Sequence, residues 1–149
     1  MFKDILLPVD REHEASWQTA LPVAIDYCKA SGARLHVLTV VPGLGVGNVS
    51  SFLPMDFEQK ILDQAGQWMH AFARDHVPSG IAVQHIVGHG KVHREILRVA
   101  AEIGADLIVM ASHKHHKPFH FLHPNTVQHV LDHARCPVVV VGPEEQEVL

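Results

Sequence analysis

The sequence contains few cysteines, few aromatic residues and no long apolar run. Two cysteines in 149 residues exclude a disulfide framework and suit a reducing compartment. No apolar run approaches the roughly 20 residues of a membrane-spanning helix. The N-terminus lacks the basic segment and cleavage site of a signal peptide, which predicts a cytoplasmic protein without a membrane partner.

Strong charge and catalytic motifs are also missing. With 12 Lys and Arg against 16 Asp and Glu, the formal net charge is −4, which argues against nucleic acid as a partner. No nucleophile elbow, Walker loop or paired-carboxylate constellation is visible, so an enzymatic role has little support. The hydrophobic share of 47% fits one globular domain, which we expect over residues 1–149.

Histidine is the residue type in excess. The chain has 14 histidines, more than its 12 lysines and arginines together. Neutral imidazoles bind Zn, Cu or Ni, so a metal site is one hypothesis, although no familiar zinc signature is present. Protonation between pH 8 and 5 would make the protein pH-responsive instead, and a solvated loop is the third reading. The candidate metal ligands are His113, His115, His116, His120 and His123.

The pattern of apolar residues predicts alternating strands and helices, and hence a single-domain α/β fold. Such alternation favours a parallel sheet with helices on both faces, and ligands then bind at the carboxyl ends of the strands. Pro22 favours a kink or a late helix start, and Asn125 is the expected N-cap of the last helix. The role of the glycine-containing segment 42–55 stays open. Strands are expected at 3–9, 34–41, 81–87, 106–111 and 137–141, helices at 14–30, 56–75, 91–103 and 125–134, and a turn at 88–90.

Three segments carry a family resemblance. Ile5-Leu-Leu-Pro-Val-Asp10, the segment 104–113 and the segment 129–141 resemble, in this order, the opening, fourth-strand and closing motifs of the universal stress protein superfamily. The resemblance implies a five-stranded, doubly wound sheet of the adenine nucleotide alpha hydrolase-like type, and a role in the stress response. It also implies a homodimer formed through the last strand, here Val138, Val139, Val140 and Val141.

Many members of this superfamily bind ATP or AMP, and the resemblance implies where such a ligand would lie. The first strand's Asp10 would meet an adenosine group, although a solvated turn residue or a helix cap is the alternative reading. A slow ATPase or an autophosphorylating protein is an alternative function. The candidate nucleotide-binding residues are Pro8, Val9, Asp10, Val40, Met110, Ala111, Ser112, His113, Lys114, Asn125 and Thr126.

The phosphate-binding part of the superfamily motif is altered in this sequence. The motif reads Gly-x-x-Gly, nine residues, then Gly-Ser or Gly-Thr, whereas this chain has Ala111 and Lys114, nine residues, then Pro124-Asn125. Glycine allows backbone amides to approach phosphate, but proline has no N–H group. We therefore expect ATP binding to be weak or absent, with the adenosine half of the site better preserved.

Overall fold

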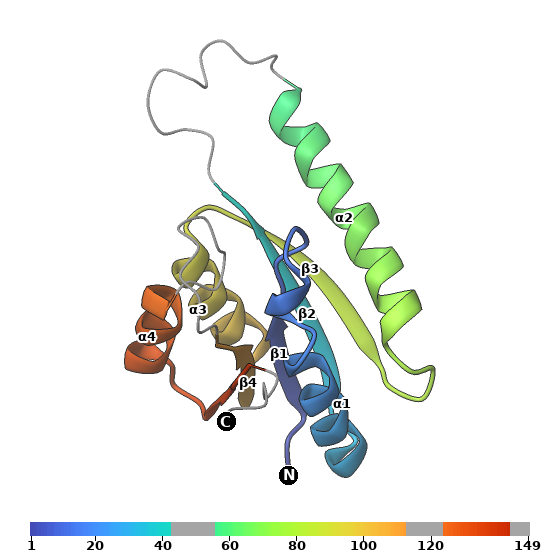
Figure 1. Cartoon of the computed structure of the whole chain (residues 1–149), viewed down its shortest axis with the longest axis vertical. Helices are drawn as coiled ribbons and strands as arrows, with labels where there is room; N and C mark the ends of the chain where they lie inside the picture. Colours follow the sequence, from blue (N-terminus) through green and yellow to red (C-terminus); the bar gives the residue numbers. More distant parts are fainter. Residues whose placement is uncertain (43–55, 113–123, 144–149) are drawn as a thin grey trace, which may run out of the picture.

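The computed structural model describes residues 1–42, 56–112 and 124–143, over which strands and helices alternate along the chain (Figure 1). All strand pairs are parallel, and the order in the sheet is β3-β2-β1-β4-β5. The predicted five-stranded parallel sheet is therefore confirmed. The strands are β1 (Asp4–Pro8), β2 (Arg34–Val41), β3 (Val83–His89), β4 (Leu107–Ala111) and β5 (Val138–Val141).

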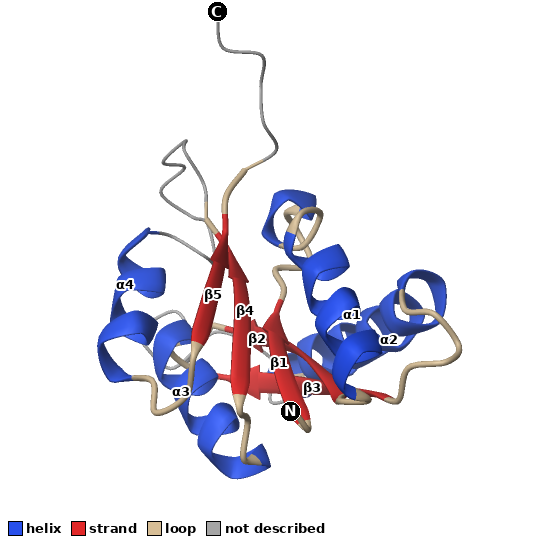
Figure 2. Cartoon of the chain, turned by 90° about the horizontal axis from the view of Figure 1, so that it is seen from below, coloured by secondary structure: helices blue, strands red, loops and turns tan. Residues whose placement is uncertain are grey.

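Helices cover both faces of the sheet. Figure 2 shows α1 and α2 on one side and α3 and α4 on the other, which is the doubly wound arrangement. In the part of the chain that the structure describes, no helix is long and apolar enough to cross a bilayer. The helices are η1 (a 3-10 turn, Glu14–Ser16), α1 (Ala20–Ser31), α2 (Phe57–His76), α3 (Val92–Ile103) and α4 (Pro124–His133).

Successive side chains of β1 point to opposite faces of the sheet and contribute to two separate hydrophobic cores. Ile5 and Leu7 belong to the cluster beneath α1 and α2, whereas Leu6 belongs to the cluster beneath α3 and α4, and all three are fully buried. Successive side chains of a strand point to opposite faces, so a strand buried on both faces needs a continuous apolar run. This is why residues 5–9 carry no charged side chain.

One buried polar cluster ties the three strands β1, β2 and β3 together. His36 is only 4% exposed, and its Nε2 lies 2.8 Å from Asp4 Oδ1. Its Nδ1 lies 2.8 Å from Gln84 Oε1. Both ring nitrogens thus have partners, as a buried polar side chain requires.

Two expected boundaries differ in the structure. The first helix begins at Ala20 rather than at residue 14, which places Pro22 in the first turn, where a missing N–H is tolerated. The third strand runs from Val83 to His89, so the prediction of a turn at 88–90 is wrong for two of its three positions. The pairing of β3 with β2 extends to Val41 and His89, because β2 is long enough to provide a partner for His89.

The predicted N-cap of the last helix is also wrong. Helix α4 begins at Pro124, so Asn125 is its second residue rather than its cap. Proline suits the first helical position because the backbone amide there has no partner within the helix, and its fixed φ matches the helix.

Candidate functional site

The strand order reverses between β1 and β4, and the candidate site lies at this point. The chain moves outward from β1 to β2 and β3, then crosses to β4 and β5 on the other side. In an open parallel sheet, this reversal leaves a crevice at the carboxyl ends of the two central strands. The predicted nucleotide-binding residues of β1 and β4 lie at these ends.

Five of the predicted site residues are apolar and buried. Val9 and Ala111 belong to the core beneath α1 and α2, and Val40 and Met110 belong to the core beneath α3 and α4, so these side chains offer no polar group to a ligand. Contacts to a polar ligand must therefore come from backbone atoms or from the loops that follow the strands. These five residues are Pro8, Val9, Val40, Met110 and Ala111.

Asp10 follows β1 and is held by its own loop. Its Oδ1 accepts a hydrogen bond of 3.0 Å from the Glu12 amide, and its Oδ2 lies 2.8 Å from His13 Nδ1. The Asp10 amide donates to Ser16 Oγ at 2.7 Å, and that hydroxyl donates back to the Asp10 carbonyl at 3.2 Å. Asp10 is 9% exposed, so it is not a solvated turn residue. The loop fixes the direction of the carboxylate without requiring a ligand.

Sequence reasoning identified Asp10 but missed His13 and Ser16. An Asp side chain commonly bonds to the backbone amide two residues later, and this turn chemistry was the available signal. Residues 14–16 were predicted as the start of a long helix, whereas they form the separate short turn η1, in which Ser16 is buried. Since η1 contacts β4, this loop lies beside the point where the strand order reverses.

The remaining described candidates lie at the end of β4 and the start of α4. The amide of the half-buried Ser112 donates to the Val141 carbonyl at 2.9 Å, which continues the β4–β5 pairing. Asn125 is exposed and Thr126 is half-buried in the first turn of α4. Amides in a first helical turn point away from the helix and favour anions, but Pro124 contributes none. His113 and Lys114 lie outside the described residues.

At the end of β3, the carboxylate of Glu95 forms a hydrogen-bond network that the sequence analysis did not predict. The Glu95 Oε1 accepts from the His89 amide at 3.1 Å, and its Oε2 accepts from Arg98 Nε at 2.9 Å. The Arg98 hydrogen bond, and then the His89 amide, lower the pKa of Glu95 although burial opposes them. A Cβ added at Gly88 would lie 3.1 Å from Glu95 Oε1, so glycine allows the close approach. This charged group supports the edge strand.

The predicted metal ligands all lie outside the described residues. Within residues 1–42, 56–112 and 124–143, no group of three or more His, Cys, Asp and Glu side chains could hold a metal ion. The described histidines of α4 make ring contacts instead. His93 of α3 stacks on His129 with ring centroids 4.2 Å apart and an interplanar angle of 13°.

Comparison with known proteins gives a consistent result. The model of the universal stress protein family matches residues 1–142. A universal stress protein of Synechocystis is 30% identical over 141 residues, covering 95% of this chain and 86% of the relative. The solved structure of UspA from Lactobacillus plantarum has a TM-score of 0.66, 24% identity and coverage of 93% and 97%. A universal stress protein crystallised in complex with cAMP has a TM-score of 0.61, 17% identity and coverage of 96% and 98%.

Proposed function

Because the chain belongs to the universal stress protein family, we propose that it is a regulatory binding module of the stress response in the cytoplasm. Its ligand site is the crevice between the ends of β1 and β4. This site accepts the adenosine part of an adenine nucleotide and holds the phosphates poorly. The observation that carries the proposal is Pro124 at the first position of α4, where the superfamily motif has glycine.

The proposal that the site binds adenosine is supported by the conformation of the loop around Asp10. Its carboxylate is buried and oriented by Glu12 and His13 before a ligand arrives. A carboxylate is a hydrogen-bond acceptor, and the ribose hydroxyls and the adenine amino group of adenosine are donors. The relative in complex with cAMP has the same fold, and cAMP contains adenosine.

The expectation of weak phosphate binding is supported by the missing backbone N–H group at the start of α4. The amides of a first helical turn are the donors that an anion meets, and proline removes one of them. One charge-assisted hydrogen bond contributes about 1.5–3 kcal/mol, or roughly 10–100-fold in affinity. The terminal phosphates of ATP therefore add little to the affinity of adenosine.

Calorimetric titration of the full chain with adenosine, AMP and ATP tests this proposal. We expect ATP to bind no more than about tenfold more tightly than adenosine, and we expect Pro124→Gly to raise the ATP affinity by about tenfold. The matched control is Pro78→Gly, which lies at the end of α2 and should change neither affinity. No heat with adenosine at millimolar concentration, or tight ATP binding by the unmodified chain, would contradict the proposal.

We also propose that the protein is a homodimer formed through β5. This strand is at the edge of the sheet, and among the described residues it pairs only with β4. Val140 is 37% exposed, and an apolar edge strand with unpaired backbone groups needs cover. A second copy related by a two-fold axis would supply an antiparallel partner to Val138, Val139, Val140 and Val141.

A further inference from the structure

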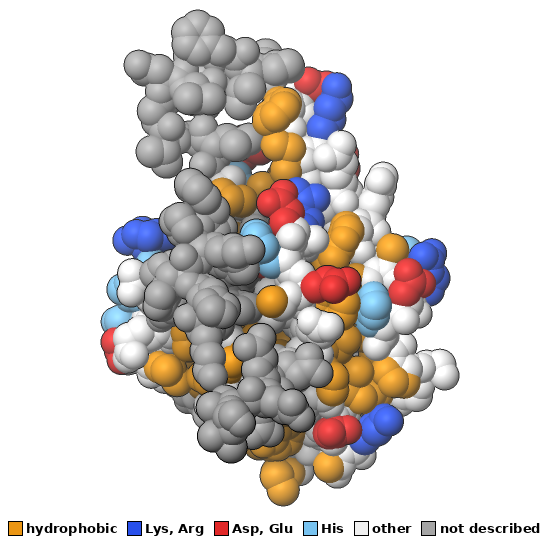
Figure 3. All heavy atoms as spheres, in the orientation of Figure 1, with side chains coloured by type: hydrophobic (Ala, Val, Ile, Leu, Met, Phe, Trp, Pro, Cys, Tyr) orange, Lys and Arg blue, Asp and Glu red, His pale blue; other side chains and the backbone are white. Residues whose placement is uncertain are grey.

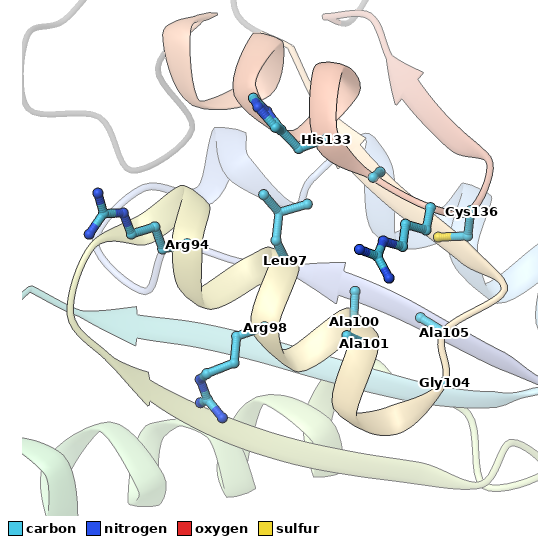
Figure 4. Close-up of a pocket in the computed structure, with 11 residues that line it drawn as sticks. Arg94, Leu97, Arg98, Ala100, Ala101, Gly104, Ala105, His133 and Cys136 are labelled. Atoms are coloured by element: carbon cyan, nitrogen blue, oxygen red, sulfur yellow. The ribbon is translucent and has the colours of Figure 1, made fainter.

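A second concave site lies along α3, from its first turn to the connection that leads into the amino end of β4. We call it the α3–α4 cavity; it lies between α3 and the last turn of α4 and has a volume of about 710 Å³ (Figure 4). Gly104 and Ala105 line it and precede β4, whereas Ser112 of the nucleotide crevice follows β4. This end of the cavity is therefore separated from the nucleotide crevice by the length of this strand.

The floor of the α3–α4 cavity is aliphatic and built from small residues. Ala100 and Leu97 point from α3 toward α4 in Figure 4, and Ala101, Ala105 and Ala134 also line the cavity. Alanine side chains leave space between the two helices that larger residues would fill. Apart from the His133 imidazole, no aromatic ring lines the described wall, so the floor suits a hydrocarbon better than a flat ring.

Positive charge surrounds this floor. Arg94 and Arg135 line the cavity, and neither makes an ion pair or hydrogen bond with another described residue. Arg98 is already paired with Glu95 and Glu102, and in Figure 4 it points away from α4. No Asp or Glu is among the described lining residues. Figure 3 shows Lys or Arg and His side chains side by side on the flank where Figure 1 places α3 and α4.

We propose that the α3–α4 cavity binds a small organic anion with an aliphatic body, namely a carboxylate or phosphate monoester on a short hydrocarbon chain. Guanidinium groups bind carboxylate and phosphate in a forked, two-point geometry, which places the head group at Arg135, just after the end of α4. Arg94 lies at the other end of the cavity, in the first turn of α3, and adds positive charge there. The hydrocarbon then covers the alanines and Leu97, which gains apolar burial. The volume lies within the range of small-molecule sites.

Titration of the full chain with octanoate and with octyl phosphate, followed by amide NMR, tests the proposal. The Gly104 amide, which donates to the Ala101 carbonyl at 3.2 Å, reports on the cavity. Gly32, at the end of α1, reports on the opposite helical layer. We expect saturable shifts at Gly104 with little change at Gly32. Octylammonium, which has the same chain and the opposite charge, should bind at least tenfold more weakly.

Two variants distinguish the contribution of the arginine charges to octanoate binding from the contribution of the cavity volume. Arg94→Gln combined with Arg135→Gln should weaken octanoate binding about tenfold or more, and Ala101→Trp should abolish it by filling the cavity. Arg74→Gln is the matched control, because Arg74 lies on α2 and is paired with Asp75. A tie between octanoate and octylammonium, or unchanged binding in the double variant, would overturn the proposal. The adenosine titration is independent of these measurements, because Asp10 and Pro124 are not altered.

Discussion

The two faces of the sheet are stabilised by different chemistry. Beneath α1 and α2, Phe72 packs edge-on against Trp17 at 5.0 Å and stacks on Trp68 at 5.1 Å. Between α3 and α4, the comparable ring contact joins His93 and His129, both of which are at least partly exposed. Large aromatic groups fill the first layer, whereas small residues and charges leave a cavity in the second. The first layer is closed by large side chains, whereas the second leaves room for the proposed anion site.

The largest expected effect comes from breaking the aromatic layer. Phe72 is 3% exposed, so Phe72→Ala should lower the free energy of unfolding by about 3–5 kcal/mol through lost burial and a new cavity. Leu97→Ala in the other layer should lower it by only about 1 kcal/mol, since Leu97 is half-buried beside existing space. Urea denaturation measures both values. Equal losses in the two variants would show that the faces do not differ in this way.

An intermediate effect is expected at the buried histidine of β2. His36 lies on the α3–α4 face of its strand, between Asp4 and Gln84. His36→Leu keeps the volume but removes both polar contacts, so the free energy of unfolding should fall by about 1–3 kcal/mol. Asp4→Asn, which retains a polar partner for the imidazole, should be milder in the same denaturation assay. If Asp4→Asn were the more damaging change, the charge of Asp4 would matter more than the hydrogen bond.

The smallest expected effect is a dependence of stability on pH. Partial burial, and then the nearby charge of His129, Lys91 and Arg94, lower the pKa of His93. The unfolded state therefore takes up this proton first as the pH falls. Stability that is present above the unfolded pKa of about 6.5 is lost as the pH falls through the lower folded pKa, and the loss is small because water screens this surface.

Urea denaturation at pH 7.5 and pH 5.5 checks this dependence. His93→Gln should lose less stability on acidification than the unmodified chain, and His129→Gln should give a similar reduction by removing the other ring. If neither substitution changes the difference between the two pH values, the stacked pair does not couple the α3–α4 layer to acidity.

Most of the fold followed from the sequence, and the exceptions have physical causes. The segment 34–41 matched β2 because most of its residues are β-branched or aliphatic, and all of them except Arg34 are buried. The edge strand β3 was displaced by two residues, since its exposed residues Val83, Gln84 and His85 show little alternation. At α4, two start signals competed, and the proline at the first position outweighed Asn125 as a cap.

The candidate site was less predictable than the fold. Asp10 could be found because it follows a buried strand at the point where the strand order reverses. The partners that orient it depend on a short 3-10 turn, which carries no periodic pattern in the sequence. The α3–α4 cavity exists because small residues of α3 face a small residue at the end of α4. The apolar pattern of a single helix cannot show which residues of another helix it will face. Such a space becomes visible only when two helices and a strand connection are packed.

The central position of β1 has a consequence for synthesis on the ribosome. One neighbour, β2, follows within about 30 residues, but the other, β4, begins at Leu107. Until that segment emerges, a nascent chain holds an apolar strand with one side open to other polypeptides. Parallel pairing between distant segments is slow, and open strand edges promote aggregation. We therefore expect chaperone demand to be highest while ribosomes translate the stretch between β3 and β4.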